Sequence, residues 1–402
     1  MSLSLKVKNE LLDRGYTRRN IAQIALGAAA ALPFFHEFAF AQDAQPGSLA
    51  RGGNDPRKFA PDVVRITSNE NPMGPSKEAI EAMGQVAARG WRYGPVGDNN
   101  DFLDLIASTE GVQPKYVTPY PGSGPALANL VPAFASPTRS WVMATPGYGN
   151  GAGKNIGNKT IQVPLRKDYS HDVEAMIKAD PNAGAYYICN PNNPTGTLTP
   201  KKDFEYILAN KQKDAVLVID EAYIHFSGRD NMSTDLVKAD KDVIVLRTFS
   251  KIYGMAGLRA GMAYGRPDLL AQLAKFGRTG NLSVATMAGA AASMKVEAAL
   301  LKERVAINKR NRDLAFEQID KLGASYIPSH SNFFMLSVKG MTGAQVGDAM
   351  AAKKVLLAGN RWPEWPAHIR VTVGTYEEMG KFNAALSQVV KEGPTQSAQA
   401  KA

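Results

Sequence analysis

Short apolar runs alternate with helical patterns through the middle of the chain. The runs of four to seven residues, typical of buried strands, are 141–145, 186–189, 215–219, 243–246 and 258–264. Stretches with helical spacing separate or follow them at 77–89, 126–134, 201–211, 267–276 and 283–295. This alternation predicts an α/β fold with a mainly parallel sheet, whose functional site lies at the carboxyl ends of the strands.

The last third of the chain has a different pattern. A long helical stretch at 296–322, rich in charge on one face, precedes strands at 332–338 and 369–373 and a helix at 342–353. We therefore expect a large domain over 79–295 and a smaller domain over 296–391. The polar residues 392–402 are predicted to be a disordered tail.

The N-terminal residues have the composition of a targeting segment. Basic residues lead to Arg18 and Arg19, an alanine-rich apolar run covers 21–35, and Ala39-Phe40-Ala41 gives a small-x-small cleavage pattern. Paired arginines before a weakly apolar run are typical of a twin-arginine export signal. We predict a signal peptide over 1–41, periplasmic location, and an arm over 42–78, with the first 45 residues outside the fold. An amphipathic or disordered N-terminal segment is the alternative. The run is too short to anchor the protein stably in a membrane.

Composition restricts the possible partners. The 402 residues are 44% hydrophobic and 21% charged, as in soluble globular proteins long enough for two domains. The net charge is +10, but no Lys/Arg run is interleaved with aromatics, which argues against nucleic acid and favours small anionic ligands. A single cysteine, Cys189, excludes an internal disulfide, and five scattered histidines argue against a metal site.

One lysine follows a predicted core strand in the string TFSKIYGMAGLRAG, residues 248–261. Ser250 precedes Lys251, and Arg259 follows eight residues later. A hydroxyl and a guanidinium are both good phosphate donors, and the intervening glycines allow the backbone close approach. Lys251 is either a solvated loop lysine or an amine held beside the aldehyde of pyridoxal phosphate.

This segment resembles the lysine signature of the fold-type I pyridoxal-phosphate enzymes, in particular the histidinol-phosphate aminotransferase-like branch. The strings NPNNPTG at 190–196, Asp220 after an apolar run, and RVTVGT at 370–375 follow the order of that family. The resemblance extends from about 65 to 390. It implies a homodimer that uses pyridoxal 5'-phosphate, with a seven-stranded, mainly parallel sheet between helices and a smaller α+β domain.

The resemblance also implies roles for individual residues. Lys251 would be the catalytic amine, and Asp220 would pair with the pyridine nitrogen, a cation that an aspartate ending an apolar strand needs. Tyr223 and Asn193 would contact the phenolic oxygen. The remaining cofactor contacts would come from Gly122, Ser123, Gly124, Tyr148, Ser250, Arg259, and Tyr93 of the neighbouring subunit. The sequence departs from the family where Gly94 replaces a proline, where Gly124 replaces an acidic residue, and where Pro125 removes one donor.

Substrate contacts are predicted for Asn71, in the string SNENPMGPS, and for Asn193. Arg370 would bind an α-carboxylate through both arms of its guanidinium. Ala358 stands where a histidinol-phosphate enzyme would carry a phosphate-binding arginine. Arg361 either replaces that arginine or belongs to a side-chain pocket with Trp362 and Trp365.

The sequence thus predicts a transaminase that moves an amino group between an amino acid, aromatic or otherwise bulky, and a 2-oxo acid. Lys251, Asp220 and Tyr223 are its expected catalytic residues. Histidinol-phosphate transamination, or another fold-type I reaction such as elimination, condensation or racemisation, remains an alternative. A non-catalytic pyridoxal-phosphate module is disfavoured, because regulators of that kind carry a DNA-binding domain where this chain has an export signal.

Overall fold

The computed structural model describes residues 3–29, 62–92, 96–149, 156–277, 282–359 and 362–394. Its centre is a seven-stranded sheet in the order β2-β8-β7-β6-β5-β3-β4. The strands are β2 Val117–Tyr120, β3 Ser140–Thr145, β4 Thr160–Pro164, β5 Ala183–Cys189, β6 Val216–Asp220, β7 Val243–Thr248 and β8 Gly261–Gly265. Only β8 runs antiparallel to its neighbours within this sheet. The predicted seven-stranded, mainly parallel sheet is therefore confirmed.

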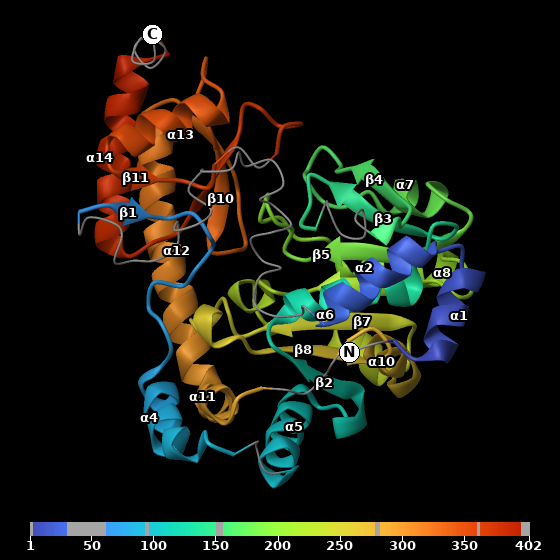
Figure 1. Cartoon of the computed structure of the whole chain (residues 1–402). Coiled ribbons are helices and arrows are strands. Elements are labelled where there is room, and N and C mark those ends of the chain that lie inside the picture. Colours follow the sequence, from blue (N-terminus) through green and yellow to red (C-terminus); the bar gives the residue numbers. More distant parts are fainter. Residues whose placement is uncertain are drawn as a thin grey trace.

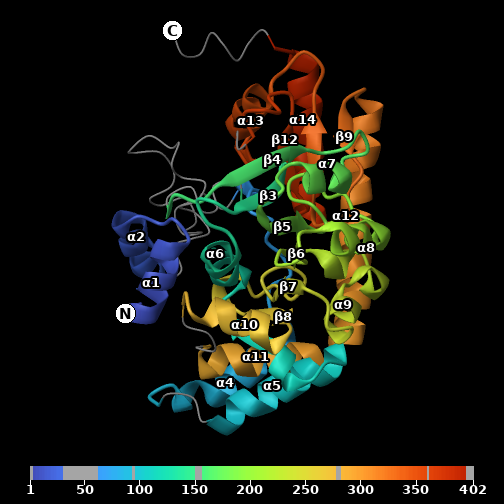
Figure 2. The same ribbon diagram turned by 90° about the vertical axis from the view of Figure 1, so that its right-hand side faces the viewer.

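Helices cover both faces of this sheet, which explains why the strands are apolar on both sides (Figures 1 and 2). Alternate residues of β6 belong to opposite cores: Leu217 lies in one cluster and Val218 in the other. The first face is covered by α6 Ser123–Phe134 and α10 Pro267–Ala274. The second face is covered by α5 Val96–Glu110, α7 Val173–Lys178, α8 Lys201–Asn210, α9 Thr234–Lys238 and α11 Val284–Lys295, against which α4 Lys77–Val86 packs.

The smaller domain has its own apolar core. The long helix α12 Glu297–Lys321 leads into an antiparallel sheet of order β12-β10-β9, covered by helices (Figure 1). The elements are β9 Ser325–Ile327, β10 Phe333–Ser337, α13 Gly343–Ala352, β12 Ile369–Thr372 and α14 Tyr376–Glu392. A two-residue strand early in the chain, β1 Val64–Arg65, pairs in parallel with β11 Val355–Leu356 and joins this domain.

Short 3-10 turns complete the fold and close several loops. They are η3 Ala87–Arg89, η4 Pro114–Tyr116, η6 Ile224–Phe226, η7 Arg229–Asn231 and η8 Ala256–Leu258. Within the described ranges no single helix is long and apolar enough to cross a membrane. The pair α11 and α12 passes that test only together, across an 83° bend.

The N-terminal segment packs onto the large domain. Helices α1 Leu5–Asp13 and α2 Arg18–Ala29 form an apolar cluster with Phe276, just after α10. This differs from the expectation that the first 45 residues lie outside the fold. The reason is that Val7 and Leu11 share one face of α1 and meet an apolar surface on the domain. Residues 30–61, with the Ala39-Phe40-Ala41 pattern, and the tail from residue 395 lie outside the described residues.

Candidate active site

Three neighbouring parallel strands place the central residues. Asn190 follows β5, Asp220 ends β6, and Lys251 lies three residues after β7. Because β5, β6 and β7 are adjacent and parallel, their carboxyl ends meet at one edge of the sheet. The expectation that Asp220 and Lys251 lie at neighbouring strand ends is met.

The amine of Lys251 is buried at this edge of the sheet, against the backbone of residues 68 and 69. Its Nζ donates to the carbonyl oxygens of Ser68 at 3.3 Å and Asn69 at 3.2 Å. Burial, followed by the nearby charge of Arg370, lowers the pKa of Lys251 to about 7. A substantial fraction of this amine is therefore neutral, and so nucleophilic, near neutral pH.

This pKa predicts how the apoprotein reacts with pyridoxal phosphate. The rate of covalent attachment should rise with pH as Lys251 loses its proton and should level off above about pH 7. An ordinary lysine, with a pKa near 10.4, would give a rate that still rises over that range. Stopped-flow absorbance on the apoprotein measures the profile. A rate that climbs steadily to pH 10 would contradict the environment described for Lys251.

Asp220 is buried and accepts two hydrogen bonds from neutral groups. The Tyr187 hydroxyl donates to Oδ2 at 3.0 Å, and the Ala222 amide donates to Oδ1 at 3.2 Å. Burial raises the pKa of Asp220 to about 6. A carboxylate held in this way is stabilised by a cation beside it, and the protonated nitrogen of a pyridine ring fits that requirement.

Candidate phosphate-binding groups gather at the start of α6. Gly122, with φ +86°, precedes the helix, and Arg259 donates from Nη1 to Ser250 Oγ at 3.3 Å. The positive φ favours glycine at this position, and a Cβ there would stand 2.3 Å from Arg259 Nη2 and would push that guanidinium aside. The helix N-terminus, the guanidinium and the hydroxyl form a donor set suited to a phosphate monoester. A Cβ at Gly124 meets nothing within 4 Å, so packing does not impose that glycine.

Arg370 connects the small domain to the sheet edge. Its Nη1 donates to Asn193 Oδ1 at 2.8 Å and its Nη2 to the carbonyl of Thr67 at 2.9 Å. Two aromatic rings lie near the guanidinium carbon: the ring centre of Phe333 is 5.5 Å away and that of Trp362 is 5.3 Å away. The substrate residues Asn193 and Arg370, predicted separately, are thus in direct contact.

The asparagine string at 69–71 lies beside the loop that carries Lys251. Asn71 donates to the carbonyl of Ile252 at 2.9 Å and so holds the loop after Lys251. Asn69, which the sequence analysis did not single out, donates to the hydroxyl of Tyr223 at 3.1 Å. Asn332 donates to the carbonyl of Asn69 at 3.0 Å and was also missed. The place of Asn69 in the same string as Asn71 was the available signal.

The structure also places Tyr148 and Cys189, whereas two other residues named in the sequence analysis are not described. Tyr148 is half-buried on the α6 side of the sheet, where burial and the charges of Asp220 and Tyr223 raise its pKa. Cys189 is buried, and its thiol pKa is raised well above the usual value, as fits a core thiol. Tyr93 and Arg361 lie outside the described residues.

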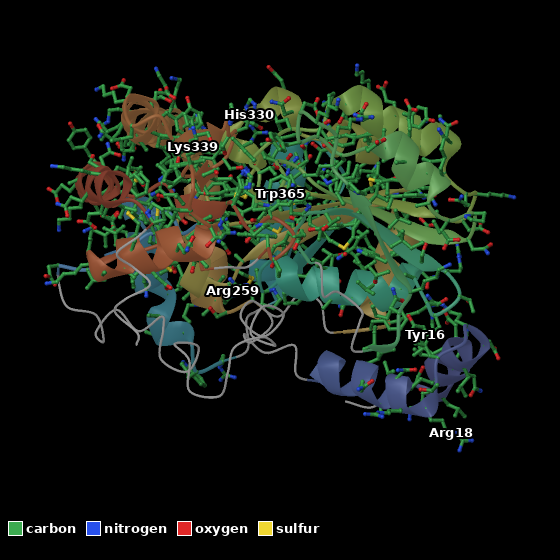
Figure 3. The ribbon with its side chains drawn as sticks, turned by 90° about the horizontal axis from the view of Figure 1, so that it is seen from above. Tyr16, Arg18, Arg259, His330, Lys339 and Trp365 are labelled. Atoms are coloured by element: carbon green, nitrogen blue, oxygen red, sulfur yellow. The ribbon has the colours of Figure 1, made fainter. Side chains whose placement is uncertain are left out.

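The rim of the site is bridged by the segment before β12. The Trp365 ring meets that of Tyr169 edge-on at 5.5 Å, and Thr145 Oγ1 donates to Glu364 at 3.2 Å. Figure 3 shows Trp365 between the small and the large domain, with Arg259 beside the ribbon of α6. In the described part of the chain, no group of three or more His, Cys, Asp or Glu side chains could hold a metal ion.

Comparison of the sequence with known protein families identifies the family of this chain. The family model for aminotransferase class I and II matches residues 61–386, so the chain belongs to that family. It is a pyridoxal-phosphate-dependent transaminase with the fold-type I architecture.

Named relatives cover most of the chain. A histidinol-phosphate aminotransferase of Cupriavidus pinatubonensis is 33% identical over 341 residues, 82% of this chain and 89% of that protein. One of Moorella thermoacetica is 30% identical over 335 residues, 82% of this chain and 86% of that protein. The Sinorhizobium meliloti histidinol-phosphate aminotransferase, solved with pyridoxal-5'-phosphate, is 26% identical with a TM-score of 0.73, over 82% of this chain and 91% of that one.

Proposed function

We propose that this transaminase accepts amino donors that carry an α-carboxylate and releases the corresponding 2-oxo acids. The observation that carries this proposal is the buried guanidinium of Arg370, held by Asn193 and Thr67 beside Lys251. Its planar fork matches a carboxylate. Arg370 is buried near the rings of Phe333 and Trp362, and the low local dielectric strengthens its attraction for an anion.

Each of the other residues then has a task. When bound, pyridoxal phosphate supplies an aldehyde for the amino group and a ring that withdraws electrons from the donor's α-carbon. Lys251 Nζ would remove the proton from that carbon and return it to the carbon that comes from the cofactor's aldehyde, because its lowered pKa suits a base near neutral pH. Asp220 would keep a negative charge against the ring nitrogen. Ser250, Arg259 and the start of α6 would hold the phosphate.

A second candidate substrate is histidinol phosphate, favoured by the names of relatives 30–33% identical to the chain. It has a phosphate and no carboxylate. Ala358 is buried, and its backbone N–H donates a hydrogen bond to the Arg370 carbonyl oxygen at 3.2 Å. Its methyl group offers no charge for a phosphate, which supports a carboxylated donor.

A half-reaction screen separates the two substrates. Each candidate amine is added to the cofactor-loaded enzyme, and the change in cofactor absorbance is followed. We expect carboxylated donors with aromatic or bulky side chains to react, and Arg370→Gln to lower kcat/KM for them by at least about 100-fold, because two charge-assisted hydrogen bonds are lost.

The exposed arginine Arg310 of α12 provides the matched control, since Arg310→Gln should leave kcat/KM unchanged. Much faster reaction with histidinol phosphate than with any amino acid would overturn the substrate proposal. A cofactor-loaded enzyme that reacts with histidinol phosphate but with no carboxylated amine would likewise contradict it.

We also propose that residues 1–41 direct export to the periplasm by the twin-arginine route. The exposed positions of Arg18 and Arg19 at the start of α2 support recognition by the export machinery. The mature protein is expected to begin at Gln42, and Arg18→Lys with Arg19→Lys should retain the precursor in the cytoplasm. N-terminal sequencing of fractionated native cells measures both. Uncleaved protein in the cytoplasmic fraction would contradict the route.

Assembly as a homodimer is a further part of the proposal. It is supported by the family resemblance, in which Tyr93 of each subunit reaches the cofactor phosphate of the other. Light scattering should give twice the chain mass, and Tyr93→Phe should weaken cofactor retention in dialysis. A monomer with full activity would contradict the shared site.

A further inference from the structure

A cavity of about 200 Å³ lies where helix α12, the segment at 71–73 and the loop at 373–376 come together. Helix α12 runs from the large domain into the small one, so the cavity lies at the junction of the two domains (Figure 1). The residues that the structure shows around it do not include Lys251, Asp220 or Arg370. Its volume is below the roughly 300–1,000 Å³ of sites for drug-sized ligands, so the cavity suits a smaller molecule.

The face of α12 that lines the cavity is polar although it is buried. Arg304 and Asn311 lie seven residues apart, about two turns, so they share one helix face, where an amphipathic helix usually carries apolar residues. Arg304 donates to the carbonyl oxygens of Ile252 and Gly74, each at 2.7 Å. Asn311 donates to the carbonyl oxygen of Gly374 at 3.0 Å. Neutral donors can also serve such carbonyls, so these hydrogen bonds do not by themselves explain the buried charge of Arg304.

Two polar atoms of the buried lining have no hydrogen-bond partner among the described residues. They are Nε of Arg304 and Oδ1 of Asn332. The Nδ2 of Asn332 donates to the carbonyl oxygens of Asn69 and Glu70, at 3.0 and 3.2 Å, and these bonds determine which way the amide is oriented. Buried polar atoms without a partner are rare in folded proteins. The cavity therefore offers a ligand one cationic donor and one acceptor.

The charge of Arg304 has no carboxylate partner in the part of the chain that the structure describes. Its guanidinium donates to backbone carbonyls, and none of the described residues of the lining is acidic. A buried cation is costly unless an anion pairs with it. Apolar side chains make up much of the remaining lining: Pro72, Met73, Phe226, Ile307 and Val373. The cavity thus combines a cation, an acceptor and an apolar wall.

We propose that this cavity binds a free α-amino acid with a small apolar side chain, as a second site separate from the one around Lys251. The carboxylate of the ligand accepts from Nε of Arg304, and its ammonium group donates to Oδ1 of Asn332. Its side chain packs against the apolar wall. The proposal depends neither on the amino donor of the reaction nor on the export route, because the catalytic residues lie outside the cavity.

The position of the ligand is tested with crystals of the borohydride-reduced holoenzyme soaked with L-selenomethionine. Reduction makes the bond between enzyme and cofactor permanent, so the active site cannot consume the probe. The anomalous signal of selenium then locates the bound molecule. We expect a selenium peak in the cavity at the junction of the domains.

Isothermal titration calorimetry on the same reduced protein tests the chemistry of recognition. L-Methionine should bind, and two analogues should each bind at least about tenfold more weakly, because each loses one charge-assisted hydrogen bond. The analogue without the amino group is 4-(methylthio)butanoate, and the analogue without the carboxylate is 3-(methylthio)propylamine.

Variants of α12 separate this cavity from other binding sites. Arg304→Gln should weaken L-methionine binding by at least about tenfold. Ile307→Phe keeps every charge and fills the cavity, and it should weaken binding by about tenfold. The matched control Lys302→Gln removes an exposed charge of the same helix outside the cavity and should bind as the unmodified protein does. Thermal unfolding of each variant shows that it is folded.

Selenium in the active site alone would overturn the proposal. So would binding at crystal concentration only, with no binding in solution. Binding of either truncated analogue as tightly as L-methionine would contradict recognition of an amino acid. If folded Ile307→Phe binds L-methionine as the unmodified protein does, the ligand lies elsewhere, and the proposal is wrong even where Arg304→Gln fails to fold.

Discussion

Replacing Lys251 by alanine is expected to lower kcat by at least about 10⁴-fold. The amine of this residue is the group that both holds the cofactor and moves the proton, and a positioned base alone accounts for about 10²–10⁴ in rate. Burial beside Ser68 and Asn69 lowers the pKa of Lys251 to about 7, so that much of this amine is neutral near neutral pH. Steady-state kinetics on purified, cofactor-loaded protein measure the loss.

The control for this variant is Lys202→Ala, which removes an exposed lysine of α8 and should leave kcat unchanged. Lys251→Ala should still bind pyridoxal phosphate non-covalently, because Ser250, Arg259 and the start of α6 remain in place. Activity within tenfold of the unmodified enzyme would show that another amine does the chemistry.

The second large effect is expected for Asp220→Asn, which keeps the shape of the side chain and removes its charge. Without a carboxylate the ring nitrogen is no longer held protonated, and the ring withdraws electrons less strongly. We expect kcat to fall by about 10³-fold with cofactor retained through its phosphate. Half-reaction kinetics and the cofactor absorbance spectrum measure the two effects separately.

The adjacent carboxylate, Glu221, should affect stability and not the reaction rate. It accepts from Arg247 Nε at 2.8 Å and from the Ser233 amide at 2.7 Å, inside the core. Glu221→Gln removes one of the two buried carboxylates that pair with Arg247, while Glu110 remains, and should lower the free energy of unfolding by about 1.5–3 kcal/mol. The fraction that remains folded should keep its kcat. If Asp220→Asn instead destabilised the fold and kept its rate, the assignment of these neighbours would be reversed.

Five strands of the large domain, β3 and β5 to β8, could be predicted because both faces are buried, so their residues are continuously apolar, as in residues 243–246. The edge strands β2 and β4 were not predicted, because they are only partly buried and lack such an apolar run. The two-residue pairing of β1 with β11 could not, because so short a strand has no pattern and exists only through tertiary contact. The packing of α1 was missed for a similar reason: an amphipathic helix in the sequence does not reveal which surface its apolar face will meet.

The residues of the site likewise divide into those whose position could be predicted from the sequence and those whose position could not. Asp220 and Lys251 could be placed at one sheet edge because chain order along parallel strands determines where their ends meet. The contact of Arg370 with Asn193 joins residues 177 positions apart in different domains, and no local pattern specifies it. Trp362 was named only as a possible neighbour of Arg361, and its position near the Arg370 guanidinium follows from tertiary packing.

The central claim is that Lys251 is the amine that holds pyridoxal phosphate. Reduction of the purified holoenzyme with borohydride, followed by proteolysis and mass spectrometry, tests it most directly. We predict a single modified peptide that carries the reduced cofactor on Lys251, and no such adduct in Lys251→Ala. An adduct on a different lysine, or an unmodified Lys251 in fully loaded enzyme, would contradict the claim.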